Sequence, residues 1–123
     1  MPAWRWILKK TALAAHQASI SAFGGTAGIR DEGLLESALA RPQNLAAYGS
    51  PTAHDLAAAY AFGIARNHPF LDGNKRMAFL ISVRFLELHG FVLWATEIEA
   101  CVIFFKLAAG EMTEYEPAKW FHE

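Results

Sequence analysis

Apolar positions recur along this chain at helical spacing, and the strict alternation that marks a half-buried strand is almost absent. A first helix is predicted from about Trp4 to Ser21, ending at Gly24 and Gly25. Asp31 can cap a second helix, which should stop at Pro42 because proline disfavours helical backbone before it. The pattern therefore predicts an all-α fold.

Two strongly apolar helices are expected in the middle of the chain, after a short helical turn and a loop between Pro42 and Pro51. Thr52 and Asp55 have the spacing of a capping box, so an alanine-rich helix should follow them. The next helix should run from Asn74 to His89 and end at Gly90, and its apolar faces predict that it is the central element.

The last part of the chain predicts a short extended link at 91–95, a helix at 96–110 and a final short helix after Thr113. About six helices are therefore expected, in a single compact domain over residues 1–123.

Composition narrows the class of protein further. The chain has a hydrophobic fraction of 54% and 19% charged residues, which suggests a compact helical domain with apolar surface left for a partner. A formal net charge of -1 argues against binding of nucleic acid through a broad basic surface. The lone Cys101 fits a reducing, cytoplasmic compartment, and no run of residues indicates a leader or a membrane span.

The candidate chemistry is concentrated in the nine residues from His68 to Arg76, with the sequence HPFLDGNKR. Histidine exchanges a proton near neutral pH, so His68 is the candidate general base. Asp72 supplies a hard oxygen ligand that suits Mg²⁺ held otherwise by water and nucleotide phosphates. These residues should line one pocket in a turn between the two central helices.

The residues after Asp72 are typical of a phosphate site. Gly73 lets the backbone approach an anion closely, and the helix that begins at Asn74 presents its N–H groups there. Lys75 and Arg76 place positive charge in a first helical turn, where a cation costs helix stability unless an anion is bound. Arg66 could reach the same pocket from the end of the preceding helix, or could be a solvated helix-end arginine.

Several polar residues outside this turn are expected to be structural. His16 lies among alanines on the first helix, where a packed or surface histidine is expected rather than a functional one. Arg30 could order the loop before the second helix or contact a substrate. Pro69 should fix the exit of the chain from its helix, and Phe70 should anchor the turn by burying its ring.

The segment from His68 to Arg76 resembles the signature of the Fic/Doc family, and within it the Doc proteins, which are the toxin half of toxin–antitoxin pairs. Residues 28–42, with the sequence GIRDEGLLESALARP, also resemble Doc-like chains. The likeness covers most of residues 16–110.

The resemblance implies a helical domain that uses ATP and Mg²⁺ to modify a hydroxyl of a target protein, with elongation factor Tu as the suggested target. His68 would take the proton of that hydroxyl and Asp72 would hold the metal. The nucleotide phosphates would be bound by Arg66, Gly73, Asn74, Lys75 and Arg76.

Two differences from the Fic signature bear on the reaction. Lys75 stands where that signature has a second glycine, and Phe79 stands where it has a second arginine. A lysine fills space near the anion and adds a charge, and Doc-type chains with this lysine resemble kinases that transfer the γ-phosphate. Met77 stands where threonine is common in Doc.

Phosphorylation is therefore favoured over transfer of AMP, and a catalytically silent protein that only binds an antitoxin is a third alternative. No segment resembles the inhibitory helix of Fic proteins. The resemblance then implies restraint by a Phd-like antitoxin whose tail folds as a helix in a groove.

Overall fold

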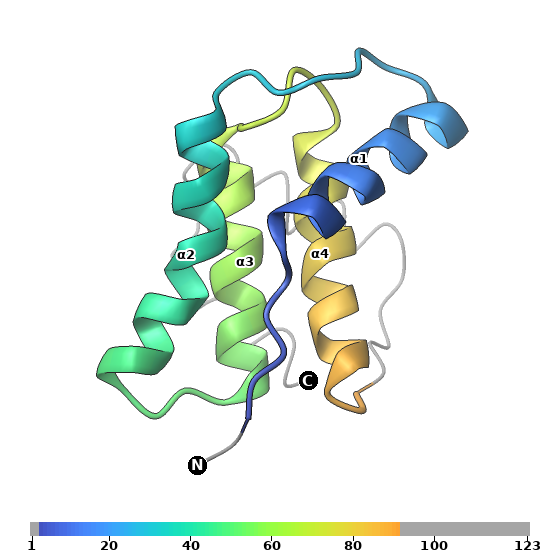
Figure 1. Ribbon diagram of the computed structural model, residues 1–123. Helices are drawn as coiled ribbons and strands as arrows, with labels where there is room; N and C mark the ends of the chain where they lie inside the picture. Colours follow the sequence, from blue (N-terminus) through green and yellow to red (C-terminus); the bar gives the residue numbers. More distant parts are fainter. Residues whose placement is uncertain (1–2, 92–123) are drawn as a thin grey trace.

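The computed structural model describes residues 3–91, which form four helices (Figure 1). They are α1 (Lys9–Phe23), α2 (Glu32–Tyr48), α3 (Ala53–Asn67) and α4 (Asn74–Leu88). In this part of the chain, β-type pairing is limited to an isolated antiparallel bridge between Ile29 and Phe70. The all-α prediction is confirmed for this part of the chain. The helices expected at 96–110 and after Thr113 lie outside the described residues.

Among the four described helices, α3 is the central one. It lies between α2 and α4 and packs against both, while α1 crosses α4 (Figure 1). Small residues make this possible, since a Cβ added at Gly63 of α3 would lie 3.2 Å from the Cα of Ala38 on α2. Within residues 3–91 the prediction that the helix after Gly73 is the central one is wrong, because α3 lies between α2 and α4. Helix α3 is rich in alanine and glycine, which let neighbouring backbones approach closely, and more of its residues are buried than of α4.

Residues before Lys9 are extended, so the prediction that the first helix starts near Trp4 was wrong. Ile7 is buried, and its backbone N–H donates to the hydroxyl of Tyr60 at 2.9 Å. The rings of Trp4 and Trp6 pack against Phe85 of α4. Contacts with α3 and α4 therefore keep this apolar segment extended, and a helix formed here would break them.

Helix α2 continues through Pro42 to Tyr48, so the predicted stop at Pro42 was wrong, and the loop predicted before Pro51 begins only at Gly49. Proline removes one hydrogen bond from a helix interior and crowds the carbonyl four residues earlier. Pro42 is buried here, and Leu45 and Ala46 beyond it pack against the core. Apolar burial of the next turn outweighs the local cost of the proline.

Other helix ends follow the signals in the sequence. The side chain of Thr52 accepts from the N–H of Asp55 at 3.1 Å, and the side chain of Asp55 accepts from the N–H of Thr52, which confirms the capping box. Helix α1 ends at Gly24, and the turn after α4 contains Gly90 with a φ of 83°. Glycine suits both positions because side chains disfavour a positive φ.

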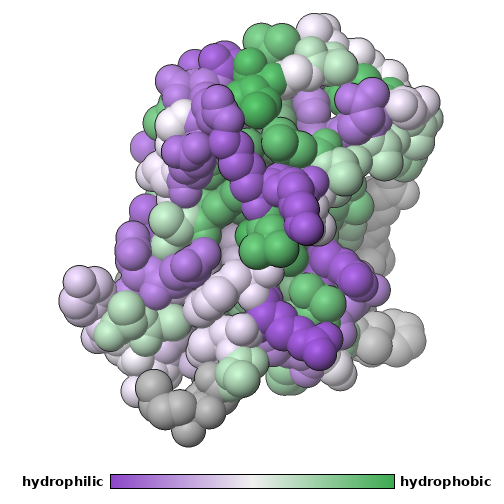
Figure 2. Space-filling model, viewed as in Figure 1, coloured by the Kyte–Doolittle hydropathy of each residue, from purple (hydrophilic) through white to green (hydrophobic). Residues whose placement is uncertain are grey.

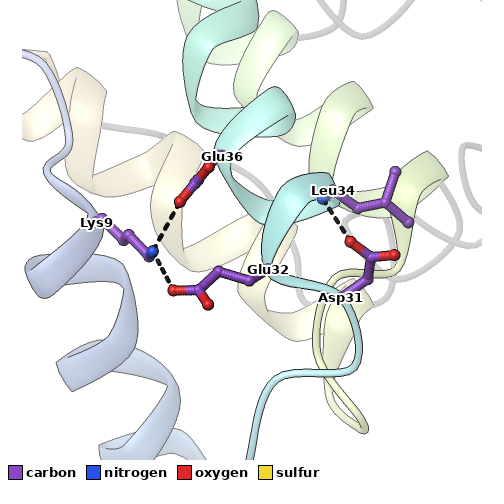
Figure 3. Close-up of polar contacts among 5 residues, drawn as sticks. All are labelled: Lys9, Asp31, Glu32, Leu34 and Glu36. Carbon is purple, nitrogen blue, oxygen red and sulfur yellow. Dashed lines mark hydrogen bonds and ion pairs between the residues drawn. The ribbon is translucent and has the colours of Figure 1, made fainter.

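The start of α2 is held in two ways (Figure 3). Asp31 accepts a hydrogen bond from the N–H of Leu34 at 2.9 Å, which confirms the predicted cap. The ammonium of Lys9 on α1 pairs with Glu32, and with Glu36 at 2.9 Å. Hydrogen bonds to Glu32 and then Glu36 raise the pKa of Lys9. The ion pairs of Lys9 link the first turn of α1 to the start of α2.

On the face seen in Figure 2, apolar surface runs between polar side chains from the top of the view towards its middle. Large apolar side chains that are exposed include Leu8, Phe23 and Leu71. Among the helices of residues 3–91, none combines the length and the apolar character needed to cross a membrane.

Candidate active site

The turn between α3 and α4 forms an open pocket of about 370 Å³, which lies within the size range of small-molecule sites of about 300 to 1,000 Å³. Its lining comes entirely from the segment singled out in the sequence: His68, Leu71, Asp72, Gly73, Asn74, Lys75 and Arg76. The prediction that these residues share one pocket is therefore confirmed.

His68 ends α3 in a left-handed conformation, with φ 48° and ψ 57°. Such a conformation costs a residue other than glycine about 1 to 3 kcal/mol, so the surrounding structure must hold it. The N–H of His68 donates to the carbonyl of Ile64 at 3.1 Å. This turn directs the chain out of α3 and leaves the imidazole at the wall of the pocket.

Arg30 holds the end of α3 from outside. Its Nε donates to the carbonyl oxygen of His68 at 2.6 Å, and its Nη2 donates to the carbonyl oxygen of Asn67 at 2.7 Å. The last carbonyls of a helix have no partner within it, and they carry the negative end of its dipole. Arg30 therefore caps α3 and fixes the backbone of the candidate base, a structural role rather than a substrate contact.

The loop before α2 is also joined to the turn by backbone hydrogen bonds. The N–H groups of Arg30 and Asp31 donate to the carbonyl of Pro69 at 2.7 and 3.1 Å, and the N–H of Leu71 donates to Gly28 at 3.0 Å. The two loops meet at one end of the helices (Figure 1). Residues 28–31 thus support the turn from behind.

Asp72 is held with its carboxylate at the pocket. One oxygen accepts from the N–H of Thr26 at 3.1 Å and the other from the N–H of Gly73 at 2.8 Å. These two bonds lower the pKa of the Asp72 carboxyl, in that order, and the charges of Arg76 and His16 add to the effect against some desolvation. The carboxylate is therefore ionised and has further lone pairs for a cation.

The lowered pKa of Asp72 makes the stability of the fold depend on pH. Because folding lowers the pKa of Asp72, its ionised form stabilises the fold above the ordinary value of 3.8, and this contribution is lost as the pH falls through the folded-state value. We expect Asp72→Asn to be less stable than the wild type at pH 6 and to differ from it less at pH 3. Urea unfolding at the two pH values measures this, and an equal difference at both would contradict it.

The first turn of α4 faces the same pocket. Gly73 precedes it with a φ of 73°, and as a glycine it supplies no side chain to cap the helix. Helix geometry leaves the first N–H groups without acceptors inside the helix, and the dipole is positive there. The arrangement suits an anion such as a phosphate.

Asn74 has a role that the sequence did not reveal. Its side-chain oxygen accepts from the N–H of Phe70 at 2.9 Å, and its side-chain nitrogen donates to the carbonyl of Phe70 at 2.9 Å. The amide thereby closes the loop that carries Asp72. The backbone of Asn74 remains in the first turn of α4, so its predicted contact with phosphate would be made by the main chain.

The two cations after Asn74 lie at the pocket. Lys75 is exposed, and Arg76 is half-buried. One guanidinium nitrogen of Arg76 donates to the hydroxyl of Ser19 at 3.3 Å, and the guanidinium carbon lies 4.8 Å from the ring centroid of Phe23. Both partners are on α1. This helix therefore steadies Arg76, whose guanidinium carries five N–H donors of the kind that suit a phosphate.

Arg66 is exposed at the end of α3 and does not line the pocket. Its predicted contact with phosphate stays a prediction. Within residues 3–91 there is no group of three or more His, Cys, Asp or Glu side chains arranged to hold a metal. A cation at Asp72 would thus take its other ligands from water and a phosphate, as Mg²⁺ commonly does.

His16 confirms the expectation of a packed histidine but also touches the site. It is 4% exposed, its ring stacks on Phe70 with centroids 4.0 Å apart, and its Nε2 lies 2.9 Å from the carbonyl oxygen of Asp72. Phe70 is itself 1% exposed, as predicted for the anchor of the turn. Spacing along the sequence gave no sign of this contact, because the two residues are 56 positions apart.

Comparison with known proteins agrees with this geometry. The profile of the Fic/DOC family matches residues 6–86, which include α1 to most of α4. A protein named Toxin Doc from Mycolicibacterium smegmatis is 47% identical over 77 residues, 60% of this chain and 58% of that protein. A protein named Protein kinase doc from Escherichia phage P1 is 37% identical over 87 residues, 70% of this chain and 69% of that protein. With the signature residues gathered at one pocket and this match over most of its length, the chain belongs to the Fic/Doc family and is Doc-like.

Proposed function

We propose that this chain is the toxin of a toxin–antitoxin pair and acts as a Doc-like protein kinase. It transfers the γ-phosphate of ATP to a hydroxyl of a target protein, with elongation factor Tu as the suggested target, and thereby blocks translation. The observation that carries the proposal is the pocket itself, which brings His68 and Asp72 together with the N-terminus of α4 and two cations.

The groups at the pocket fit a nucleotide triphosphate. Oxygens of the phosphate chain would accept from the first N–H groups of α4, where Gly73 leaves room for close approach. Lys75 and Arg76 would balance the negative charge, and Arg66 would join them only if its side chain turned toward the pocket. Binding at a helix N-terminus also removes the cost of placing cations there.

Asp72 fits a magnesium site of the kind found with nucleotides. Its carboxylate is ionised, and two backbone N–H groups fix its direction. Mg²⁺, when bound, neutralises charge on the phosphate oxygens. The remaining task of the protein is then to hold the target hydroxyl and His68 in line with the γ-phosphate.

His68 would take the proton of the target hydroxyl as the hydroxyl oxygen attacks the γ-phosphorus. The bond from that phosphorus to the bridging oxygen breaks, the electron pair stays on this oxygen, and ADP leaves. The products are a phosphorylated target and ADP, with the proton on the imidazole. Positioning and electrostatic stabilisation would supply most of the rate, as is usual for phosphoryl transfer.

The choice of γ-phosphate rests on Lys75. Its side chain lies at the pocket where Fic proteins have glycine, so it both occupies space and adds charge next to the phosphates. The name of the phage relative, Protein kinase doc, supports the same choice. Restraint by an antitoxin is supported by the name of the other relative, Toxin Doc, while its Phd-like character rests on the resemblance of the sequence to Doc proteins.

Labelled ATP tests the proposed reaction. We expect transfer of label from γ-labelled ATP, and none from α-labelled ATP, to a protein of a bacterial lysate and to purified elongation factor Tu. The matched variant is Lys75→Gly, which restores the Fic residue and should lower transfer of γ label. Transfer of α label by the wild type would instead support AMP transfer, and transfer of neither would support a silent antitoxin-binding protein.

A further inference from the structure

We propose that His16 is a positioning residue for Asp72: seated on Phe70, it fixes the peptide plane between Asp72 and Gly73 and thereby the direction of the carboxylate. The inference concerns the apo protein's geometry, and its importance for the reaction rests on the proposed function.

The hydrogen bond of His16 has a defined direction. A carbonyl oxygen can only accept, so the Nε2 of His16 must carry the hydrogen that it shares with the carbonyl of Asp72 at 2.9 Å. Stacking on the ring of Phe70, at an interplanar angle of 11°, leaves the imidazole little freedom to turn away. Both rings are buried, so water cannot readily replace this donor.

The covalent geometry of the peptide carries the effect to the carboxylate. The carbonyl of Asp72 and the N–H of Gly73 belong to one planar trans unit and point in opposite directions. When His16 holds the carbonyl on one side, the N–H on the other side is aimed at the Asp72 carboxylate, 2.8 Å away. Rotation of this plane would remove the donor from that oxygen.

The other carboxylate oxygen is held from the end of α1, the helix that carries His16. The N–H of Thr26 donates to it at 3.1 Å. Gly25 permits this approach, because a Cβ added there would lie 2.7 Å from the same oxygen, and its φ of 116° disfavours a side chain. Helix α1 therefore binds the carbonyl of Asp72, and the turn after it binds the carboxylate.

Two substitutions separate the hydrogen bond of His16 from its packing. His16→Phe keeps an aromatic ring against Phe70 but removes the donor, whereas His16→Gln keeps a donor of similar reach and loses the ring. Ser82→Ala is the matched control, since it removes a buried side-chain hydrogen bond to a carbonyl, that of Phe79 on α4, outside the pocket.

Amide hydrogen exchange of Thr26 and Gly73, measured by NMR on the protein without nucleotide, is the first readout. We expect His16→Phe to speed exchange at both amides by about fivefold or more, as loss of one hydrogen bond implies. His16→Gln should stay within about twofold of the wild type, because the donor that holds the carbonyl is kept. Ser82→Ala should leave both amides unchanged.

The Mg²⁺ concentration that gives half-maximal phosphate transfer is the second readout. His16→Phe should raise it by about fivefold with a smaller change in kcat, and His16→Gln should restore it. Wild-type protein that transfers no phosphate would overturn the proposed function, and the exchange measurement would still decide the role of His16. Equal exchange in His16→Phe and wild type, or equal changes in both His16 variants, would overturn the positioning role.

Discussion

Replacing His68 by alanine should lower phosphate transfer by about 10² to 10⁴, which is the usual contribution of a general base. Of the other polar side chains that line the pocket, Lys75 and Arg76 carry only hydrogen-bond donors and Asp72 is the proposed metal ligand, which leaves the imidazole of His68 to take the hydroxyl proton. Rates are measured with γ-labelled ATP and purified target at saturating nucleotide.

The fold should survive this substitution. Alanine is no better suited than histidine to the left-handed backbone at this position, whereas asparagine is, so His68→Asn removes the base with less strain. Both variants should lose activity alike. His54→Ala, at the opposite end of α3, is the matched control and should stay within about twofold of the wild type. Activity of His68→Asn within tenfold of the wild type would contradict the assignment of the base.

Replacing Arg30 by alanine should lower the free energy of unfolding by about 2 kcal/mol, because two hydrogen bonds from a charged group at the end of α3 are lost. The exposed position of Arg30 keeps the effect below the sum expected for buried bonds. Phosphate transfer should also fall, because the carbonyl of His68 then loses the guanidinium that holds it. Urea unfolding and steady-state rates measure the two effects.

Two other arginine variants serve as references for this loss of stability. Arg30→Lys keeps the charge near the helix end but cannot donate from two nitrogens at once, so its stability should lie between wild type and Arg30→Ala. Arg41→Ala removes an arginine of α2 that lies over the ring of Phe62, a contact worth about 0.5 to 1 kcal/mol at an exposed site. A loss in Arg30→Ala no larger than in Arg41→Ala would contradict the capping role.

Local signals in the sequence predicted most of the helix ends, because caps act within three or four residues. The side chains of Asp31, Thr52 and Asp55 bond as their spacing indicated. Pro42 is the exception, since burial of the turn beyond it outweighed the local rule. The extended segment before α1 and the central place of α3 depend on which surfaces meet, and a pattern of apolar positions leaves that open.

The candidate site, like the helices, was predictable only where the signals are local in the sequence. The residues that line the pocket all fall within one short segment, from His68 to Arg76, so their spacing was enough to bring them together. The groups that orient them come from elsewhere: Arg30 is 38 positions from His68, and His16 is 56 positions from Asp72. Their partners are backbone carbonyls, which carry no mark in a sequence. Side-chain identity alone could not have predicted these contacts.

The joining of the loop before α2 to the turn after α3 has a consequence for engineering. A helical hairpin made of α3 and α4 would contain every residue that lines the pocket, yet it would lack Arg30, Thr26 and His16. Transplanting that hairpin into another scaffold would carry the reactive groups without the donors that aim them. A working graft would need to bring the stretch from α1 to the start of α2 with it.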